Sequence, residues 1–189
     1  LKDVLERIPQ DAHPMDVLRT GCSMLGNLEP EDSFEQQLDK TNRMLSAFPA
    51  IINYWYRFSH EGVKIDCVTD AETIGGHFLQ LLKGEKPSEL HEHVMNVSLI
   101  LYAEHEFNAS TFTARVCAST LSDIFSCITG AIGSLRGPLH GGANEAAMEL
   151  IESFDSPEAA EAGLMGMLER KDKIMGFGHA IYSDSDPRN

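Results

Sequence analysis

Three histidines in the second half of the chain lie in short motifs rich in glycine or asparagine, and they are the residues best placed for chemistry. They are His105 in 104–108 (EHEFN), His140 in 137–142 (GPLHGG) and His179 in 176–179 (GFGH). Glycine beside a histidine removes bulk and permits backbone angles that other residues resist, so that a turn can aim the imidazole into a cleft. The sequence therefore predicts that the three histidines belong to one active site.

His140 is expected where a loop meets the start of a helix. The positive end of a helix dipole disfavours imidazolium, so a histidine there tends to be neutral at pH 7. A neutral imidazole can still donate a hydrogen bond to a carbonyl oxygen and thereby stabilise an enolate. The alternative is that His140 only caps the helix.

His179 and Arg188 are nine residues apart across a polar turn. A guanidinium group binds a carboxylate through two parallel hydrogen bonds, and His179 could then act as an acid toward a neighbouring carbonyl. The alternative is a glycine-rich loop with an arginine on the surface. His105, which lies between two glutamates, could by itself be a structural histidine.

A metal site is not expected at His91 and His93. Histidines two positions apart point to different sides of a helix, whereas the zinc-protease pattern needs a spacing of four with a glutamate after the first histidine. No metal or redox cofactor is predicted. A metal-binding helical protein nevertheless stays open as an alternative.

Apolar residues recur at steps of three and four along most of the chain, which predicts an all-α fold. Pro49 is expected to bend or divide the first long helix. The second half of 88–102 is apolar nearly all round, which predicts a helix buried on several sides that carries His105 just after its end. Only 63–68 competes as a strand. The expected helices span 33–58, 70–82, 88–102, 111–129, 142–153 and 156–170.

Composition excludes several classes of protein. The formal net charge is −14 and no cluster of lysine or arginine occurs, so nucleic acid is not an expected partner. No run of about 18 apolar residues suggests a membrane span. The four cysteines lack paired metal spacing, and no targeting segment opens the chain, so we expect reduced thiols and a cytoplasmic location. A change to alanine, glycine and glutamate places a domain boundary near His140, dividing 1–140 from 141–189.

Four blocks in the same order and spacing resemble the citrate synthase family over the whole chain. They are 104–110 (EHEFNAS), 134–144 (SLRGPLHGGAN), 176–179 (GFGH) and 186–188 (DPR). The resemblance implies a homodimeric, all-helical enzyme whose large and small domains close over a cleft. Residues 1–140 would then be part of the large domain, and 141–189 would be the start of the small domain.

The resemblance also implies roles for individual residues. His105 and Arg188 would bind oxaloacetate, and His179 would bind and protonate the oxaloacetate carbonyl. His140 would stabilise the enol of the acyl thioester. The coenzyme A site would be lined, largely through backbone, by Lys173, Ile174, Met175, Gly176 and Phe177.

Within the family, 104–112 and 178–189 are most similar to the 2-methylcitrate synthases. This implies condensation of propionyl-CoA with oxaloacetate and water to 2-methylcitrate and CoA in propionate catabolism, with side activity on acetyl-CoA. A citrate synthase that uses acetyl-CoA is the alternative, and a non-catalytic helical interaction module is an alternative of another class. The family pattern puts the catalytic aspartate and further arginines after Asn189, so the 189 residues alone are expected to be inactive.

Overall fold

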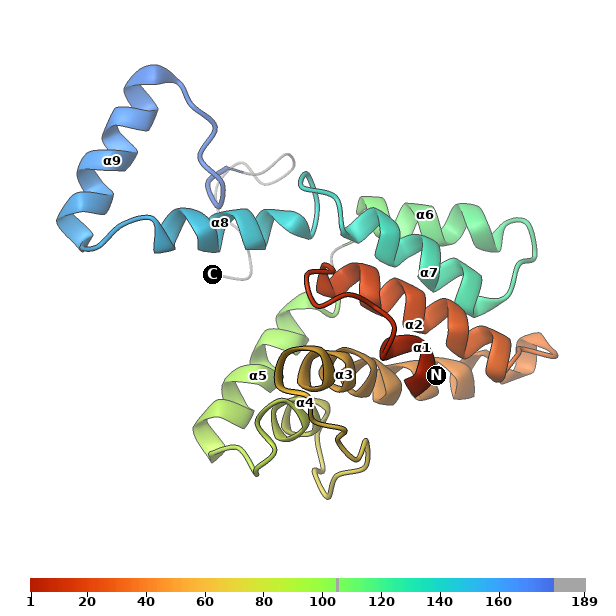
Figure 1. Ribbon diagram of the computed structural model, residues 1–189. Coiled ribbons are helices and arrows are strands. Elements are labelled where there is room, and N and C mark those ends of the chain that lie inside the picture. Colours follow the sequence, from red (N-terminus) through yellow and green to blue (C-terminus); the bar gives the residue numbers. More distant parts are fainter. Residues whose placement is uncertain (105, 179–189) are drawn as a thin grey trace. The chain divides into compact units, whose positions relative to one another are not determined.

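The computed structural model describes residues 1–104 and 106–178, and all the regular structure in those ranges is helical (Figure 1). This confirms the predicted all-α fold. Within the same ranges, no helix combines the length and apolarity needed to cross a bilayer. The helices are α1 (Lys2–Leu5), α2 (Pro14–Leu28), the 3-10 helix η1 (Phe34–Gln36), α3 (Gln37–Glu61), α4 (Ile74–Lys83), α5 (Glu89–Tyr102), α6 (Ala109–Ala118), α7 (Ile124–Leu135), α8 (Gly142–Glu152) and α9 (Pro157–Arg170).

The chain forms two compact units, Leu1–Ser134 and Leu135–Asn189. The division of domains at His140 stays a prediction. In the first unit, α3 packs against α1, α2 and α4, and α4 packs against α5. Its core consists of Leu5, Val17, Leu18, Cys22, Leu25, Met44, Ala47, Ile51, Tyr54, Trp55, Phe125 and Ile132.

Two glycines let α2 approach its neighbours closely. A Cβ atom built on Gly21 would stand 2.5 Å from Cγ2 of Ile51, and one built on Gly26 would stand 2.7 Å from Cβ of Phe125. Since real Cβ atoms do not come so close to other carbon atoms, any larger residue would force the helices apart. The contacts join α2 to α3 and to α7.

The N-terminal segment is tied to α3 through one phenol group. The buried Tyr54 hydroxyl donates a 2.6 Å hydrogen bond to Glu6, and the Lys64 ammonium lies 2.8 Å from the same carboxylate. The Lys2 ammonium lies over the Tyr54 ring, 4.7 Å from its centroid. Burial, followed by the hydrogen bond to Glu6, raises the pKa of Tyr54 to about 12.

The first long helix is one element. Its α-helical part begins at Gln37 after η1 and continues through Pro49 to Glu61, where Gly62 ends it in a left-handed conformation. Of the two predicted alternatives at Pro49, one bent helix or two helices, the structure therefore has one helix. The next helix begins at Ile74, four residues after the predicted start at Asp70, because the Thr73 hydroxyl accepts from the N–H of Gly76.

The prediction of one helix over 111–129 is wrong. The structure has two helices, because α6 ends at Ala118 and α7 begins at Ile124. Leu121 between them has φ of 64°, which a continuing helix does not allow. The Asp123 carboxylate accepts hydrogen bonds from the N–H (2.9 Å) and the hydroxyl (2.6 Å) of Ser126, and so fixes the new helix start.

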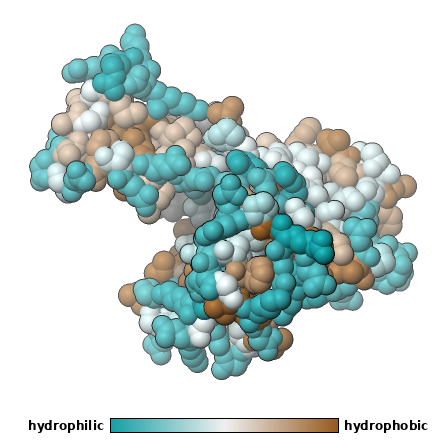
Figure 2. All heavy atoms as spheres, in the orientation of Figure 1, coloured by the Kyte–Doolittle hydropathy of each residue, from teal (hydrophilic) through white to brown (hydrophobic). Residues whose placement is uncertain are grey.

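The prediction that the helix over 88–102 is buried on several sides is also wrong. None of the residues in α5 is buried, and Ile100 is 72% exposed. Figure 2 shows hydrophobic residues at the surface over α5 and over α6 and α7. The sequence pattern shows how apolar side chains are distributed around a helix. It does not show whether another element covers them.

In the second unit, α8 and α9 begin and end close to the predicted positions. Pro157 occupies the first turn of α9, and the Ser156 hydroxyl accepts from the N–H of Ala159 at 3.2 Å. The Phe154 ring, in the loop between the two helices, covers Gly163 on α9, since a Cβ built there would overlap the ring. Across 135–178, no residue of this unit is buried.

Candidate functional site

His140 lies directly before the first residues of α8, in a tight loop. Its backbone N–H donates to the carbonyl of Gly137 (2.9 Å), and its own carbonyl accepts from the N–H of Ala143 (3.1 Å). The Gly137 carbonyl also accepts from Gly142 at 3.2 Å. Residue 140 is therefore fixed by its backbone on both sides, and its side chain is partly exposed.

The first backbone N–H groups of α8 donate hydrogen bonds to carbonyls of the loop before it. The N–H groups of Gly142, Ala143 and Asn144 donate to Gly137, His140 and Gly141 respectively. Gly141 is the residue before the helix and gives no side-chain cap. The structure thus places His140 at the positive end of the α8 dipole, the position that the sequence predicts.

The candidate coenzyme A segment, Lys173–Phe177, follows the end of α9 in the same unit. Lys171 ends α9 with a φ of 58°, and the N–H of Asp172 donates back to Met167 at 2.9 Å. Lys173 and Phe177 are exposed, the latter 68%. An ammonium group and an aromatic ring are therefore both open to a ligand on this segment.

Gly176 brings this segment onto α8. Its φ is 90°, a left-handed value that favours glycine, and a Cβ built there would lie 3.2 Å from Cβ of Ala147. Figure 1 shows the segment after α9 returning to α8. The His140 loop and the segment 173–177 are thus both attached to one helix within one unit, the first before its start and the second along its length.

Three of the predicted site residues, His105, His179 and Arg188, lie outside the described residues. The described neighbours of His105 show what its motif does locally. The N–H of Glu106 donates to the Glu104 carboxylate. The Asn108 side chain accepts from the N–H of Thr111 at 3.0 Å and thereby caps α6. The asparagine of this motif therefore has a structural role that sequence reasoning missed, although an asparagine before a helix is a known start signal.

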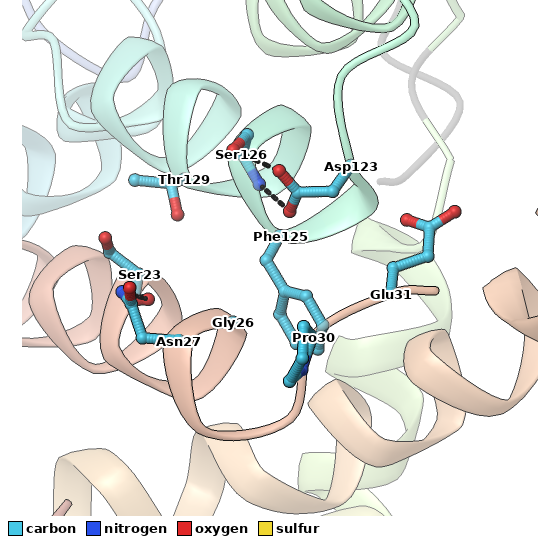
Figure 3. Close-up of a pocket in the computed structure, with 9 residues that line it drawn as sticks. All are labelled: Ser23, Gly26, Asn27, Pro30, Glu31, Asp123, Phe125, Ser126 and Thr129. Atoms are coloured by element: carbon cyan, nitrogen blue, oxygen red, sulfur yellow. Dashed lines mark hydrogen bonds between the residues drawn. The ribbon is translucent and has the colours of Figure 1, made fainter. Parts of the chain in front are cut away.

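A pocket of about 450 Å³ in the first unit was not predicted from the sequence (Figure 3). The two carboxylates that line it each accept a hydrogen bond from a backbone N–H group. Asp123 caps α7 through Ser126, and Glu31 accepts from the N–H of Ile124 at 2.6 Å. Burial raises the pKa of Asp123, but the hydrogen bonds from Ser126, together with those from the backbone of Asp123 and Phe125, keep that pKa below its usual value. The lining residues are Ser23, Gly26, Asn27, Pro30, Glu31, Asp123, Phe125, Ser126 and Thr129.

The pocket therefore has a structural role within the first unit. Its two carboxylates fix the start of α7, the helix that leads into the His140 loop. Over 1–104 and 106–178, no three histidine, cysteine, aspartate or glutamate side chains are grouped so that they could hold a metal ion.

The helical architecture and the motif around His140 can be compared with those of known protein families. The family described as "Citrate synthase, C-terminal domain" matches residues 1–189. The chain belongs to the citrate synthase family.

Individual relatives give the likeness in more detail. The chain is 74% identical to a 2-methylcitrate synthase of Shewanella oneidensis over 189 residues, which are all of this chain and 50% of the relative. It is 43% identical to a citrate synthase of Heyndrickxia coagulans, over 98% of this chain and 50% of that protein. The chain thus spans about half the length of these curated relatives.

A solved structure of the family has the same fold. The chain matches citrate synthase from Thermoplasma acidophilum with a TM-score of 0.86 and 28% identity, over 98% of this chain and 49% of that one. That structure is a ternary complex with carboxymethyl coenzyme A and oxaloacetate.

Proposed function

We propose that this chain supplies substrate-binding and catalytic residues to a 2-methylcitrate synthase, a C-acyltransferase that joins propionyl-CoA, oxaloacetate and water into 2-methylcitrate and CoA. The observation that carries the proposal is the 74% identity over the whole chain to the Shewanella oneidensis 2-methylcitrate synthase, against 43% to a citrate synthase. The complex of the Thermoplasma acidophilum relative supports oxaloacetate and a coenzyme A thioester as the substrate classes.

His140 is proposed to hold the thioester oxygen of the acyl-CoA. Removal of a proton from the α-carbon places negative charge on that oxygen, and a neutral imidazole that donates a hydrogen bond stabilises the enol. The backbone bonds on both sides of residue 140 support this role, because an electrophile must already be in place when the charge develops. The proton is taken by a carboxylate that we place in the part of the enzyme outside this chain, so the 189 residues alone are expected to be inactive.

Oxaloacetate is proposed to bind to His105, His179 and Arg188. Arg188 pairs with a carboxylate, and His179 donates a proton to the ketone oxygen as the new carbon–carbon bond forms. Hydrolysis of the thioester then releases CoA. The exposed side chains of Lys173 and Phe177 support a role for the segment 173–177 in holding coenzyme A, since an ammonium group suits phosphate and an aromatic ring suits a base. No metal or redox cofactor has a step in this reaction.

A homodimer is part of the proposal. Three side chains on α5 and α6 are large, apolar and exposed, namely Ile100 (72%), Phe112 (62%) and Val116 (57%). Apolar residues so placed are typical of surfaces that associate, and we assign these helices to the contact with a second copy.

The four free cysteines accord with a cytoplasmic location, where thiols stay reduced.

Kinetics of the full-length enzyme test the acyl preference. We expect a higher kcat/KM for propionyl-CoA than for acetyl-CoA, by roughly 10- to 200-fold, because a pocket that accommodates one more carbon gains about 1–3 kcal/mol. A preference for acetyl-CoA would instead establish the second candidate, a citrate synthase like the Heyndrickxia coagulans relative, which is 43% identical.

Ligand binding tests the alternative of a non-catalytic helical module. Oxaloacetate and CoA should raise the melting temperature of the full-length protein, since a ligand that binds only the folded state stabilises it. No shift with either ligand, together with unchanged behaviour of His140→Ala, would support the interaction module.

A further inference from the structure

The two glycines after His140 have ordinary helical backbone, which removes the usual explanation for glycine in a functional loop. Gly141 has φ of −62° and ψ of −30°, values that every L-residue adopts, and Gly142 is the first residue of α8. The expectation that these glycines serve unusual backbone angles is therefore not met. Their role must come from the missing side chain.

A side chain at Gly141 would collide with backbone, and one at Gly142 would be crowded by it. A Cβ at Gly141 would stand 2.7 Å from the carbonyl oxygen of Leu135 and 2.7 Å from Cδ1 of the same residue. A Cβ at Gly142 would stand 3.0 Å from the carbonyl oxygen of Gly137 and 3.2 Å from that of Arg136. The Leu135 side chain can rotate away, but a carbonyl oxygen can only move together with its chain.

One of these three carbonyls, that of Gly137, also holds the loop. The Gly137 oxygen accepts from both His140 (2.9 Å) and Gly142 (3.2 Å), so one acceptor ties the histidine to the helix start. Displacing the backbone at 135–137 to make room for a methyl group would lengthen these bonds. Residue 140 would then move with them.

We propose that Gly141 and Gly142 are positioning residues for His140. The absence of a side chain at both lets the carbonyls of Leu135, Arg136 and Gly137 lie against the first turn of α8, and this close contact sets the place of the imidazole. The inference rests on the proposed role of His140 in the reaction. Because a displacement on the order of 1 Å at a reacting group can cost 100-fold in rate, the loss of this contact is measurable.

The test uses the full-length enzyme with propionyl-CoA and oxaloacetate. Gly141→Ala is expected to lower kcat by at least about tenfold, while KM for oxaloacetate stays within about twofold, because the histidine but not the oxaloacetate site is displaced. Gly142→Ala should lower kcat by a smaller factor, since its contacts are longer. The matched control is Gly166→Ala on α9, where a Cβ would meet only the flexible end of Arg170 at 3.2 Å, and kcat should stay within about twofold.

A double-mutant cycle separates positioning from a general structural effect. In a His140→Ala background, Gly141→Ala should cause no further loss of kcat, because there is no imidazole left to misplace. An equal further loss in that background would overturn the inference, as would an unchanged kcat in Gly141→Ala. If Gly141→Ala does not fold, the milder Gly142→Ala gives the same cycle. His140→Ala with normal kcat would instead refute the proposed function, so the two failures are distinguishable.

Discussion

The two units of the chain differ in where they keep their apolar side chains. The first unit buries Tyr54, Trp55 and Phe125 to 2% exposure each, whereas the second unit, over 135–178, buries no residue. His140 and the segment 173–177, two of the proposed substrate contacts, both lie in the second unit. The buried core is therefore concentrated in the first unit, while these two candidate contacts lie in a unit without buried residues; His105, a further candidate, belongs by sequence to the first unit. Segments with few buried contacts open at lower free-energy cost, as binding elements often do.

The largest expected effect comes from the core of the first unit. Trp55→Ala should lower the free energy of unfolding by about 3–5 kcal/mol, because it removes a buried aromatic side chain and leaves a cavity. Urea denaturation followed by far-ultraviolet circular dichroism measures the loss without relying on tryptophan fluorescence. The matched change in the second unit is Leu168→Ala, which is 58% exposed and should cost about 0.5 kcal/mol or less. Equal losses of unfolding free energy in the two variants would contradict the difference in burial between the units.

A second expected effect concerns thiol reactivity. Burial, followed by a hydrogen bond with Cys117, raises the pKa of Cys127 to about 11 from its ordinary value of 9.0. Because only the thiolate reacts, two pKa units slow alkylation at pH 8 by roughly 100-fold relative to the unfolded chain. Iodoacetamide labelling with peptide mass spectrometry measures this ratio.

The second unit contains no cysteine, so a reference must be introduced there. Met148→Cys places a thiol on α8 at a position that is 55% exposed, and its folded and unfolded labelling rates should agree within a few-fold. Strong protection of the thiol at position 148 from alkylation would show that side chains of the second unit are shielded from solvent to the same extent as those of the first.

The smallest expected effect concerns α7, which carries core residues of the first unit and ends at Leu135, where the second begins. Asp123→Ala should lower the free energy of unfolding by about 1 kcal/mol at pH 7, through loss of the cap on Ser126. The folded pKa of Asp123 lies below its ordinary value of 3.8. Its contribution is therefore complete above that value and disappears as the pH falls through the lower, folded pKa.

Unfolding free energies of Asp123→Ala and the wild type should consequently converge once the pH falls below the folded pKa of Asp123. Ser88→Ala is the uncharged control, since its hydroxyl accepts from the N–H of His91 at 3.3 Å. The deficit of that variant should persist across the same pH range. A deficit of Asp123→Ala that also persists would mean that the carboxylate charge has no part in the cap.

Local signals in the sequence were sufficient for several helix ends from α4 onward, but α1 and α2 were not predicted at all. Ser156 followed by Pro157 marks the start of α9, and Gly84 marks the end of α4 with a φ of 77°. The break between α6 and α7 was missed because Asp123 and Ser126, which form a start signal, lie inside a stretch of helical periodicity. The exposure of α5 was missed because an apolar pattern reports composition and not the neighbours of a helix.

The candidate site shows the same limit. The place of His140 before a helix follows from the glycines and the alanine-rich stretch around it. The reason for Gly141 does not, because it depends on the distance to a carbonyl oxygen six residues earlier. Likewise, the approach of Gly176 to Ala147 joins two segments that are separate in sequence, and only folding brings them into contact.

The hydrogen bond between Tyr54 and Glu6 also makes the ionisation of Tyr54 in alkaline solution a measure of whether the N-terminal segment is docked. A phenol absorbs differently once it loses its proton, and Tyr54 keeps that proton to about pH 12 while the N-terminal segment stays docked on α3. Release of the segment would return the ring toward the ordinary phenol value near 10. The absorbance change between these two pH values that is lost in Tyr54→Phe, one of four tyrosines, therefore reports whether the first few residues of the chain are attached.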